Sequence, residues 1–291
     1  MEIRSNEPMA KHVTWRAGGK VACACFPQDL ADLAAFMGTL RHDEPLLMVG
    51  LGSNLLIRDG GFDGTAIFTH GALDKLRLEP DGTIYAEAGV PSPKLARFAA
   101  QHDRSGAEFL AGIPGTLGGA LALNAGCHGG ETWSFVERVQ MLNRHGELIL
   151  RTPADFAIAY RRAGLKESTD EIFVAAWLRF PAGDGATARA RIKELLEKRS
   201  TTQPLQLPNA GSVFRNPPGD YAARLIEAAG LKGIEEDGAR VSEKHANFIV
   251  NPDGKATAAA IESLIGRIQV AVREQFGVEL VREVRILGVK N

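Results

Sequence analysis

The chain has 291 residues, of which 45% are hydrophobic and 24% charged, as is usual for a globular protein that buries a large core. Its 34 Lys and Arg residues nearly balance its 35 Asp and Glu residues, so its charge gives no reason to expect nucleic-acid or membrane binding. No apolar run is long enough to cross a bilayer, and the N-terminus lacks the pattern of a secretory signal. The 3 cysteines do not complete a metal site or a disulfide framework, so we expect a reduced, cytoplasmic protein.

Short apolar runs separated by glycine-containing turns predict strands in the first half of the chain. Two of these runs flank Arg144-His145-Gly146, and this spacing predicts an antiparallel hairpin. The predicted strands are 46–49, 65–68, 83–87, 139–143, 147–150 and 172–180, and the last of them is apolar enough to be central.

Helices are predicted where a capping residue precedes apolar residues that recur every three or four positions. Ser92, followed by Pro93, predicts the N-cap of a helix that ends near Gln101. The remaining elements follow a Gly- and Pro-containing stretch at 181–186. They are a basic helix at 188–199, a helix capped by Asp220 and closed by Gly230, a longer helix from Thr257, and strands at 246–250 and 278–287.

The change in composition near residue 184 divides the chain into two predicted domains. Residues 1–184 form an α+β region with many turns, which we expect to split again near 70–80 into two α+β subdomains. Residues 185–291 form a smaller α+β domain. The sequence contains no internal repeat or low-complexity tract.

Two glycine-rich segments follow apolar runs in the first predicted domain. The segment at 50–55 starts like a dinucleotide fingerprint but lacks the third glycine, so a Rossmann domain is not expected. The segment at 111–126 permits close approach of a bulky anion such as a pyrophosphate, although it lacks the Gly-Lys-Ser/Thr of a Walker A loop. Tight turns are the alternative explanation, but the presence of two such segments favours a dinucleotide-binding site.

The loop at 209–217 places one hydroxyl, that of Ser212, between a glycine and an apolar residue. The loop is too rich in Asn, Gly and Pro to be regular helix or strand, and such loops usually hold one polar atom in a fixed place. A surface turn is the alternative. Together with the glycine-rich segments and an acidic residue near the C-terminus, the loop indicates an enzyme site built from distant parts of the chain.

A series of short motifs extends along nearly the whole chain. In order they are Gly50-x-Gly52-Ser53-Asn54, Gly112-Ile113-Pro114-Gly115-Thr116-x-Gly118-Gly119-Ala120, Asn124-Ala125-Gly126, Tyr160-Arg161, Gly211-Ser212-x-Phe214-x-Asn216-Pro217, Lys244-His245-Ala246-Asn247-Phe248 and Glu283-Val284-Arg285. This ordered set resembles the UDP-N-acetylenolpyruvoylglucosamine reductase family, in the more compact of its two types. Each motif is weakly specific, whereas the ordered set is strongly specific.

The resemblance implies an α+β fold with a bipartite FAD-binding region of the vanillyl-alcohol-oxidase-like (PCMH) type and a smaller C-terminal substrate domain. It implies non-covalent FAD, NADPH as reductant, and reduction of the enolpyruvyl ether of UDP-N-acetylglucosamine to UDP-N-acetylmuramate for peptidoglycan precursor synthesis. The expected partners are this nucleotide sugar and NADPH, and we expect a monomer. The implied FAD-binding residues are Gly50, Gly52, Ser53, Asn54, Leu55, Gly112, Pro114, Gly115, Thr116, Gly118, Gly119, Asn124, Ala125 and Gly126.

The same resemblance implies the catalytic residues Arg161, Ser212 and Glu283. Arg161 would stabilise the charge that builds on the substrate carboxylate, Ser212 would donate a proton to carbon, and Glu283 would orient or protonate the intermediate. Arg162 is the rival of Arg161, but successive side chains point apart in extended structure, so only one of them faces the site. Only the match to the motif favours Glu283 over Glu279. A surface ion pair is the alternative for both Arg161 and Glu283.

Substrate contacts are also implied by the resemblance. A solvated helix face explains the basic pair at 198–199 nearly as well, and a structural role is equally expected of the histidine at 245. Asn247 is a further candidate to line the same cleft. The implied substrate-binding residues are Tyr160, Asn216, Lys198, Arg199 and His245.

Two other functions remain open. A related flavin oxidase could attach FAD covalently through His12, Cys23 or Cys25, and yellow colour left in solution after acid precipitation would exclude it. A non-catalytic nucleotide-binding module would hold no flavin, and a visible spectrum of the purified protein would distinguish it.

Overall fold

The computed structural model describes residues 1–167 and 170–291. Its contacts divide the chain into two compact units, and the division crosses several strands. Unit 1 comprises residues 1–4, 24–51 and 65–199, and unit 2 comprises residues 5–23, 52–64 and 200–291. The last crossing therefore lies at residues 199–200, whereas the composition of the sequence changes near residue 184. Both units contain helices and strands, as expected for an α+β protein.

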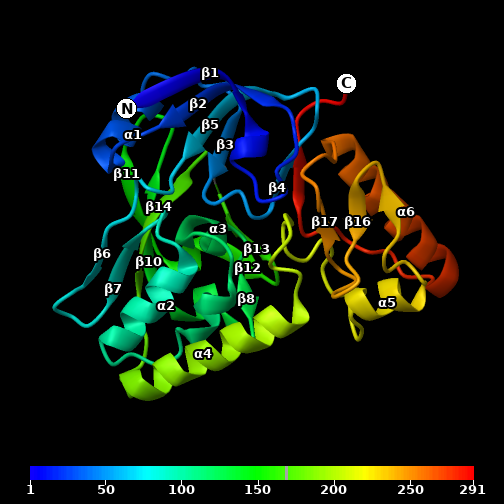
Figure 1. The fold of residues 1–291 in the computed structure, drawn as a ribbon. Helices are drawn as coiled ribbons and strands as arrows, with labels where there is room; N and C mark the ends of the chain where they lie inside the picture. The colour runs from blue at the N-terminus through cyan, green and yellow to red at the C-terminus, as the bar shows by residue number, and fades with distance from the viewer. Residues whose placement is uncertain (168–169) are drawn as a thin grey trace. The chain divides into compact units, whose positions relative to one another are not determined.

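Unit 1 contains a five-stranded sheet with the order β11-β10-β14-β7-β6, in which all neighbours are antiparallel (Figure 1). The predicted central strand and the predicted hairpin are both confirmed, since β14 lies in the middle and β10 pairs with β11. The strands are β6 (Leu76–Leu78), β7 (Ile84–Glu87), β10 (Val136–Leu142), β11 (Leu148–Arg151) and β14 (Ile172–Leu178).

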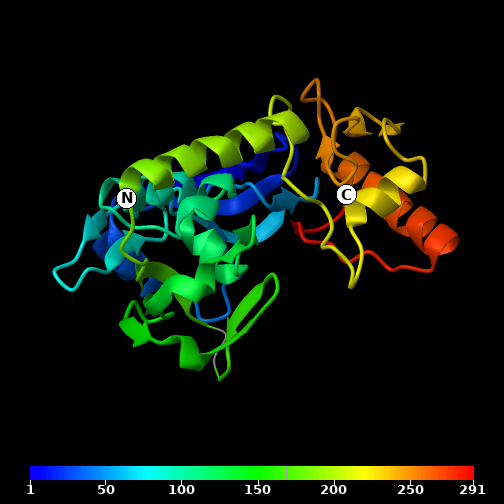
Figure 2. The same ribbon diagram turned by 90° about the horizontal axis from the view of Figure 1, so that it is seen from below.

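The helices α2 (Ser92–Gln101), α3 (Leu117–Ala122) and α4 (Gly185–Thr202) share one hydrophobic core with this sheet. Leu95, Leu117 and Ile192 are buried in the same cluster as Leu178 of β14. Figure 2 shows α4 as one long helix along a side of unit 1. The predicted cap of α2 is wrong: Pro91 takes the N-cap position, and the Ser92 side chain makes no capping hydrogen bond because it already lies inside the first turn.

A second sheet has the order β1-β2-β5-β3, and its strands β3 and β5 are parallel. Helix α1 (Leu30–Met37) begins at Asp29, whose carboxylate accepts a hydrogen bond from Asp32 N at 2.8 Å. Within unit 1, Leu33 of α1 packs in a core that also contains Cys25 and Ile67. The strands are β1 (Glu2–Pro8), β2 (Lys20–Phe26), β3 (Leu46–Val49) and β5 (Phe62–Phe68).

Unit 2 is built around helix α6 (Ala258–Phe276), which Thr257 caps and Gly277 ends in the left-handed conformation. The apolar face of α6 is buried together with Trp15 and Leu56. The predicted strands 246–250 and 278–287 are only partly formed, because most of their residues bond to loops rather than to a strand ladder. The other elements are α5 (Ala222–Ala228), β4 (Leu55–Ile57), β15 (Glu235–Glu236), β16 (Ala239–Val241), β17 (Ile249–Val250) and β18 (Arg285–Leu287).

Short elements complete the described chain. They are η1 (Met9–Lys11), η2 (Glu108–Gly112), η3 (Thr132–Phe135), η4 (Pro153–Asp155), β8 (Gly126–Cys127), β9 (Gly130–Glu131), β12 (Phe156–Ala159) and β13 (Arg162–Leu165). Within residues 1–167 and 170–291, no helix is long and apolar enough to cross a membrane, and no group of three or more His, Cys, Asp or Glu could hold a metal ion.

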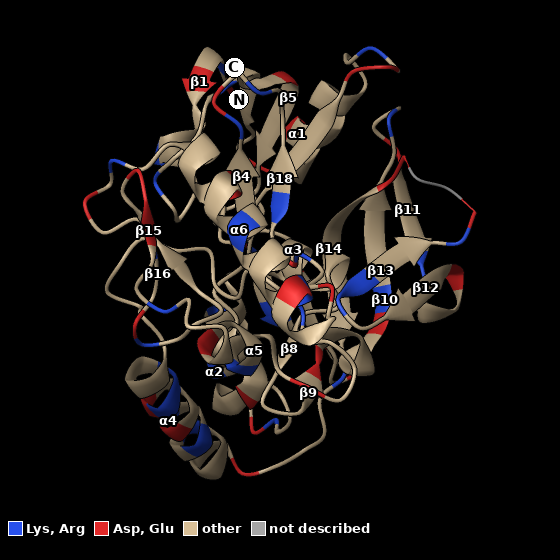
Figure 3. Ribbon diagram, turned by 90° about the vertical axis from the view of Figure 1, so that its right-hand side faces the viewer, with Lys and Arg blue, Asp and Glu red and all other residues tan. Residues whose placement is uncertain are grey.

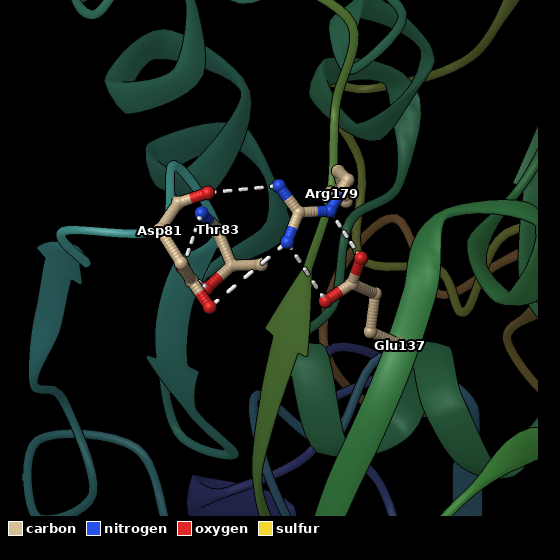
Figure 4. A network of polar contacts seen from close by, with 4 residues as sticks. All are labelled: Asp81, Thr83, Glu137 and Arg179. Atoms are coloured by element: carbon tan, nitrogen blue, oxygen red, sulfur yellow. Dashed lines mark hydrogen bonds and ion pairs between the residues drawn. The ribbon is translucent and has the colours of Figure 1, made fainter.

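A polar network at the surface of unit 1 joins β10 to the end of β14 and to the β6–β7 turn (Figure 4). Arg179, which follows β14, pairs with Glu137 of β10 and donates to Asp81 O at 2.9 Å in the β6–β7 turn. The Asp81 carboxylate accepts from Thr83 Oγ1 at 2.6 Å and from Thr83 N at 2.9 Å. These hydrogen bonds lower the pKa of Asp81, so its charge is kept to acidic pH.

Candidate active site

The two glycine-rich segments predicted to bind a dinucleotide meet in unit 1. A Cβ atom added to Gly50 would lie 2.3 Å from Thr116 Oγ1, so this approach requires glycine. The amides of Leu117 and Gly118 each donate at 2.8 Å to carbonyls of the segment 88–90. The glycine pattern suggested that the backbone of this segment faces a ligand. These two amides instead donate to the protein itself.

Other glycines in this segment leave space above the backbone. Gly119 is exposed, and a Cβ atom added to it would meet no heavy atom within 4 Å. Pro114 is exposed and Gly115 is half-buried, whereas Gly112 packs against Cys127, whose Sγ would lie 2.8 Å from an added Cβ. Gly112 and Gly118 thus pack against neighbouring residues, whereas Gly119 leaves space over the backbone. Such a surface fits the bulky phosphates and rings of FAD.

Residues 52–55 belong to unit 2. Gly52 has a φ of +61°, and an added Cβ would lie 2.0 Å from His12 O, so this glycine is needed for packing. Ser53 is half-buried, while Leu55 is buried in β4. Asn54 reaches the predicted catalytic acid, because its Nδ2 donates to Glu283 O at 3.2 Å. Sequence reasoning did not connect these two residues, which are 229 positions apart.

Asn124 has internal partners at both ends of its buried side chain. Its Nδ2 donates to Glu131 Oε2 at 3.1 Å, and its Oδ1 accepts from Trp133 N at 3.1 Å. Ala125 O accepts from a threonine hydroxyl at 2.7 Å, and Gly126 packs closely on the carbonyl of the neighbouring strand β9. The structure thus uses the 124–126 segment to fix local geometry.

Arg161 lies in the turn between β12 and β13 with a φ of 56°, a conformation that is uncommon for a residue with a side chain. Its Nη2 donates to Gly126 O at 2.8 Å, and its guanidinium carbon lies 5.0 Å from the Tyr160 ring centroid. Arg161 is half-buried, whereas Arg162 is exposed. The two arginines therefore occupy different environments, but Arg161 lies in a turn and not in the extended structure on which the expected alternation rested.

Basic residues of α4 share the surroundings of Arg161. Burial raises the pKa of the Cys127 thiol, and the positive charges of Arg199 and Arg161 oppose that rise. Burial lowers the pKa of His128, and Lys198, Arg191 and Arg199 lower it further. Figure 3 marks the Lys and Arg residues of α4 in blue.

The causes of these shifts bring predicted catalytic and substrate-binding residues of unit 1 together in one basic cluster, consisting of Arg161, Lys198 and Arg199 with the neutral ring of His128. Burial also lowers the pKa of Arg199, which is half-buried, whereas Lys198 is exposed. Two half-buried guanidinium groups beside a lysine suit a carboxylate or a diphosphate. His128 was missed in the sequence, where its only signal is its place directly after the glycine-rich segment.

The two predicted catalytic residues of unit 2 lie on neighbouring segments. Val213, which follows Ser212, accepts a hydrogen bond at its carbonyl from Glu283 N at 2.8 Å. Phe214 forms an isolated antiparallel bridge with Arg282. Ser212 and Glu283 are both half-buried. The structure therefore brings together residues that are far apart in the sequence.

Two predicted substrate contacts have structural roles in unit 2. Asn216 is exposed, and its Oδ1 accepts from Ala222 N at 3.1 Å at the start of α5. The predicted cap of α5 by Asp220 is wrong, because Tyr221 takes the N-cap position. His245 Nδ1 accepts from Asn247 N at 3.3 Å, and burial lowers the histidine pKa, so its ring is neutral near pH 7.

The residues considered for covalent flavin attachment are constrained differently. His12 Nε2 lies 2.8 Å from Glu7 Oε1, within unit 2. Cys25 is 0% exposed and Cys23 is half-buried. Attachment through Cys25 would require opening the core that surrounds it.

Comparisons with known proteins agree with the motifs. A family model described as an FAD binding domain matches residues 21–150, and the C-terminal domain of UDP-N-acetylenolpyruvoylglucosamine reductase matches residues 203–287. The reductase of that name from Legionella pneumophila (strain Corby) is 56% identical over 287 residues, covering 98% of this chain and 92% of that protein. The one from Thiobacillus denitrificans is 54% identical over 299 residues, with the same two coverages.

A solved structure gives the same result. The crystal structure of UDP-N-acetylenolpyruvylglucosamine reductase from Thermus caldophilus matches with a TM-score of 0.83 and 29% identity, covering 98% of this chain and 99% of that one. The predicted fold, with an FAD-binding region and a C-terminal reductase domain, is confirmed. The chain belongs to the UDP-N-acetylenolpyruvoylglucosamine reductase family and is an FAD-dependent oxidoreductase.

Proposed function

We propose that this enzyme uses NADPH to reduce UDP-N-acetyl-3-O-(1-carboxyvinyl)-glucosamine to UDP-N-acetylmuramate, in peptidoglycan precursor synthesis, and that it acts as a monomer. The observation that carries the proposal is the hydrogen bond of 2.8 Å from Glu283 N to Val213 O, which holds the backbone of the Ser212 loop beside that of Glu283. An acid and a proton-donating hydroxyl on adjacent segments suit the protonation of carbon. The names of its relatives, which match over nearly the whole chain, supply the substrate.

The cofactor would rest on the glycine-rich surface described above. Gly50 allows that surface to form by packing against Thr116, and Gly119 leaves space over it. When bound, reduced FAD supplies the hydride for one alkene carbon of the substrate.

Arg161 would bind the substrate carboxylate, on which negative charge builds as the alkene is reduced. A guanidinium offers several donors in one plane, and the bond of 2.8 Å from Nη2 to Gly126 O fixes the orientation of that plane. A cation held in place before the reaction stabilises developing charge without reorganisation. Lys198 and Arg199 of the same cluster would bind the diphosphate of the nucleotide sugar.

Ser212 would donate the proton to the second alkene carbon. A serine hydroxyl is a weak acid, so donation requires a strongly basic carbon and a nearby group that compensates the charge left on oxygen. Glu283 on the adjacent segment would orient the reacting carbon or return a proton to the serine. Both residues depend on Val213, whose backbone joins their two segments.

A stopped-flow experiment in two stages tests this function. The purified yellow protein is first mixed without oxygen with NADPH, and loss of flavin absorbance is expected. Mixing with the enolpyruvyl nucleotide should then restore the absorbance and produce UDP-N-acetylmuramate. If the flavin stays reduced at saturating nucleotide, the proposed reaction is refuted. If NADH reduces the flavin faster than NADPH does, the choice of NADPH is refuted. If light scattering gives the molar mass of a dimer, the proposed monomer is refuted.

A further inference from the structure

Asn247 is buried beside the Ser212 loop and bonds to both polar backbone atoms of one residue. Its Nδ2 donates to Phe214 O at 2.8 Å, and its Oδ1 accepts from Phe214 N at 3.0 Å. Its own carbonyl accepts from Val213 N at 2.9 Å. The sequence analysis made Asn247 a candidate to line a cleft. The residue is only 4% exposed, so it does not line an open cleft.

The opposite side of the same segment is held by backbone atoms alone. Val213 O accepts from Glu283 N at 2.8 Å, and Arg215 N donates to Val281 O at 2.9 Å. Residues 213–215 thus behave like a short strand that has a backbone neighbour on one side. On the other side the amide of Asn247 takes the place of a peptide group.

We propose that Asn247 is a positioning residue that fixes the Ser212 hydroxyl for proton transfer by clamping Phe214. This inference rests on the proposed function, in which Ser212 is the proton donor. The amide carries a donor and an acceptor in one plane, and burial limits its rotamers, so the clamp defines the position of the loop. Loss of the clamp displaces the hydroxyl, and a displacement of about 1 Å lowers the rate of a reaction by about a hundredfold.

Asn251 provides a matched control in the same unit. It is 0% exposed, its Nδ2 donates to Trp15 O at 2.9 Å, and its Oδ1 accepts from Ala256 N at 3.0 Å. Its side chain therefore makes the same pair of bonds as Asn247 but to partners outside the Ser212 loop. Replacing either residue with aspartate keeps the size and one acceptor while it removes the N–H donor.

The first test measures the two half-reactions separately. Flavin reduced with dithionite is mixed with the enolpyruvyl nucleotide, and reduction of oxidised flavin by NADPH is followed in a second experiment. In Asn247→Asp, reoxidation should slow about a hundredfold while reduction stays within about twofold of the wild-type rate. In Asn251→Asp, both rates should stay within about twofold even though thermal stability falls similarly.

A double-mutant cycle and an isotope effect separate positioning from a general structural defect. In the Ser212→Ala background, Asn247→Asp should change reoxidation by less than about twofold, because the group that it positions is already absent. In the single Asn247→Asp variant, the solvent deuterium isotope effect on reoxidation should increase, since proton transfer limits the rate. Asn251→Asp should leave the isotope effect unchanged.

Several results would overturn the inference. If Asn247→Asp reoxidises the flavin at the wild-type rate, the clamp is excluded. If Asn247→Asp slows reoxidation as much in the Ser212→Ala background as in the wild type, Asn247 does not act through Ser212. If Ser212→Ala itself reoxidises at the normal rate, the proton-donor assignment in the proposed function fails, and that single measurement identifies the failure. Where Asn247→Asp does not retain flavin, Asn247→Ala, which places no second oxygen against Phe214 O, is measured in the same way.

Discussion

The two units hold their proposed functional residues by different interactions. In unit 1, Gly50 and Thr116 meet through steric fit, and one side-chain hydrogen bond to Gly126 O holds the cation of Arg161. In unit 2, the segment that follows Ser212 is held by hydrogen bonds to its backbone. The contrast follows from the chemistry that each set would perform. Charge acts over a range of distances, whereas proton transfer demands a precise distance between two atoms.

Removing the hydroxyl of Ser212 tests the unit 2 side of this comparison and should have the largest effect. In Ser212→Ala, reoxidation of reduced flavin by the enolpyruvyl nucleotide should slow about a thousandfold, because no group replaces the proton donor. Reduction by NADPH should be unchanged. Stopped-flow absorbance of the flavin measures both steps, and equal losses in the two would indicate a structural defect.

Removing Arg161 tests the unit 1 side. Arg161→Ala should lower the reoxidation rate about a hundredfold, because charge on the substrate carboxylate loses its fixed cation. Arg161→Lys should restore only part of the rate, since an ammonium group lacks the planar fork. The exposed neighbour is the control: Arg162→Ala should react within about twofold of the wild type. A larger loss in Arg162→Ala than in Arg161→Ala would reverse the assignment of the two arginines.

Substitutions of two glycines in unit 1 distinguish a glycine needed for packing from a glycine that leaves room for the cofactor. Gly50→Ala should destabilise the protein by about 2 kcal/mol, because the new methyl overlaps Thr116 Oγ1. Adding Thr116→Ala should recover part of that loss, since the nearest overlapping atoms are removed. Gly119→Ala meets no atom within 4 Å, so stability should be kept while affinity for FAD falls. Thermal unfolding and flavin titration of the apoprotein measure these effects, and unchanged affinity in Gly119→Ala would exclude it from the cofactor surface.

Much of the fold follows from local sequence patterns, and the errors have identifiable causes. Helix α6 was predicted from Thr257 and its apolar periodicity, and both are confirmed. The strand predicted at 278–287 is real only at Arg285–Leu287, because the preceding residues pair with the loop after Ser212. Strand propensity indicates an extended backbone but does not identify its hydrogen-bond partner.

The candidate site was predictable as a set of residues but not as an arrangement. The order of motifs identified Arg161, Ser212 and Glu283, whereas the bond of Asn54 to Glu283 O spans 229 positions and has no local signal. The resemblance made Asn247 a candidate to line the substrate cleft. Instead, the Asn247 side chain is buried and bonds to the backbone of Phe214, 33 positions away.

A pH experiment on unit 2 concerns an ion pair that includes no catalytic residue, and its effect should be the smallest. Glu262 of α6 binds Arg58 at 2.8 and 2.9 Å, and these bonds lower the pKa of its carboxyl group. A lowered pKa in the folded state adds stability above the unfolded pKa, and this stability is lost as the pH falls through the folded pKa. Glu262→Gln should therefore cost about 1 kcal/mol at pH 7 and less at acidic pH.

Hydrogen exchange at neutral pH should locate that loss. Exchange in α6 should accelerate in Glu262→Gln, whereas exchange in α2 of unit 1 should change less, because the Arg58 pair joins two segments of unit 2. Glu274→Gln, at an exposed position of the same helix, is the matched control and should leave both regions unchanged. Equal acceleration in α2 and α6 would show that the two units unfold as one cooperative body. The hydrogen bonds around Ser212 and the steric contacts of Gly50 would then be lost in the same unfolding event.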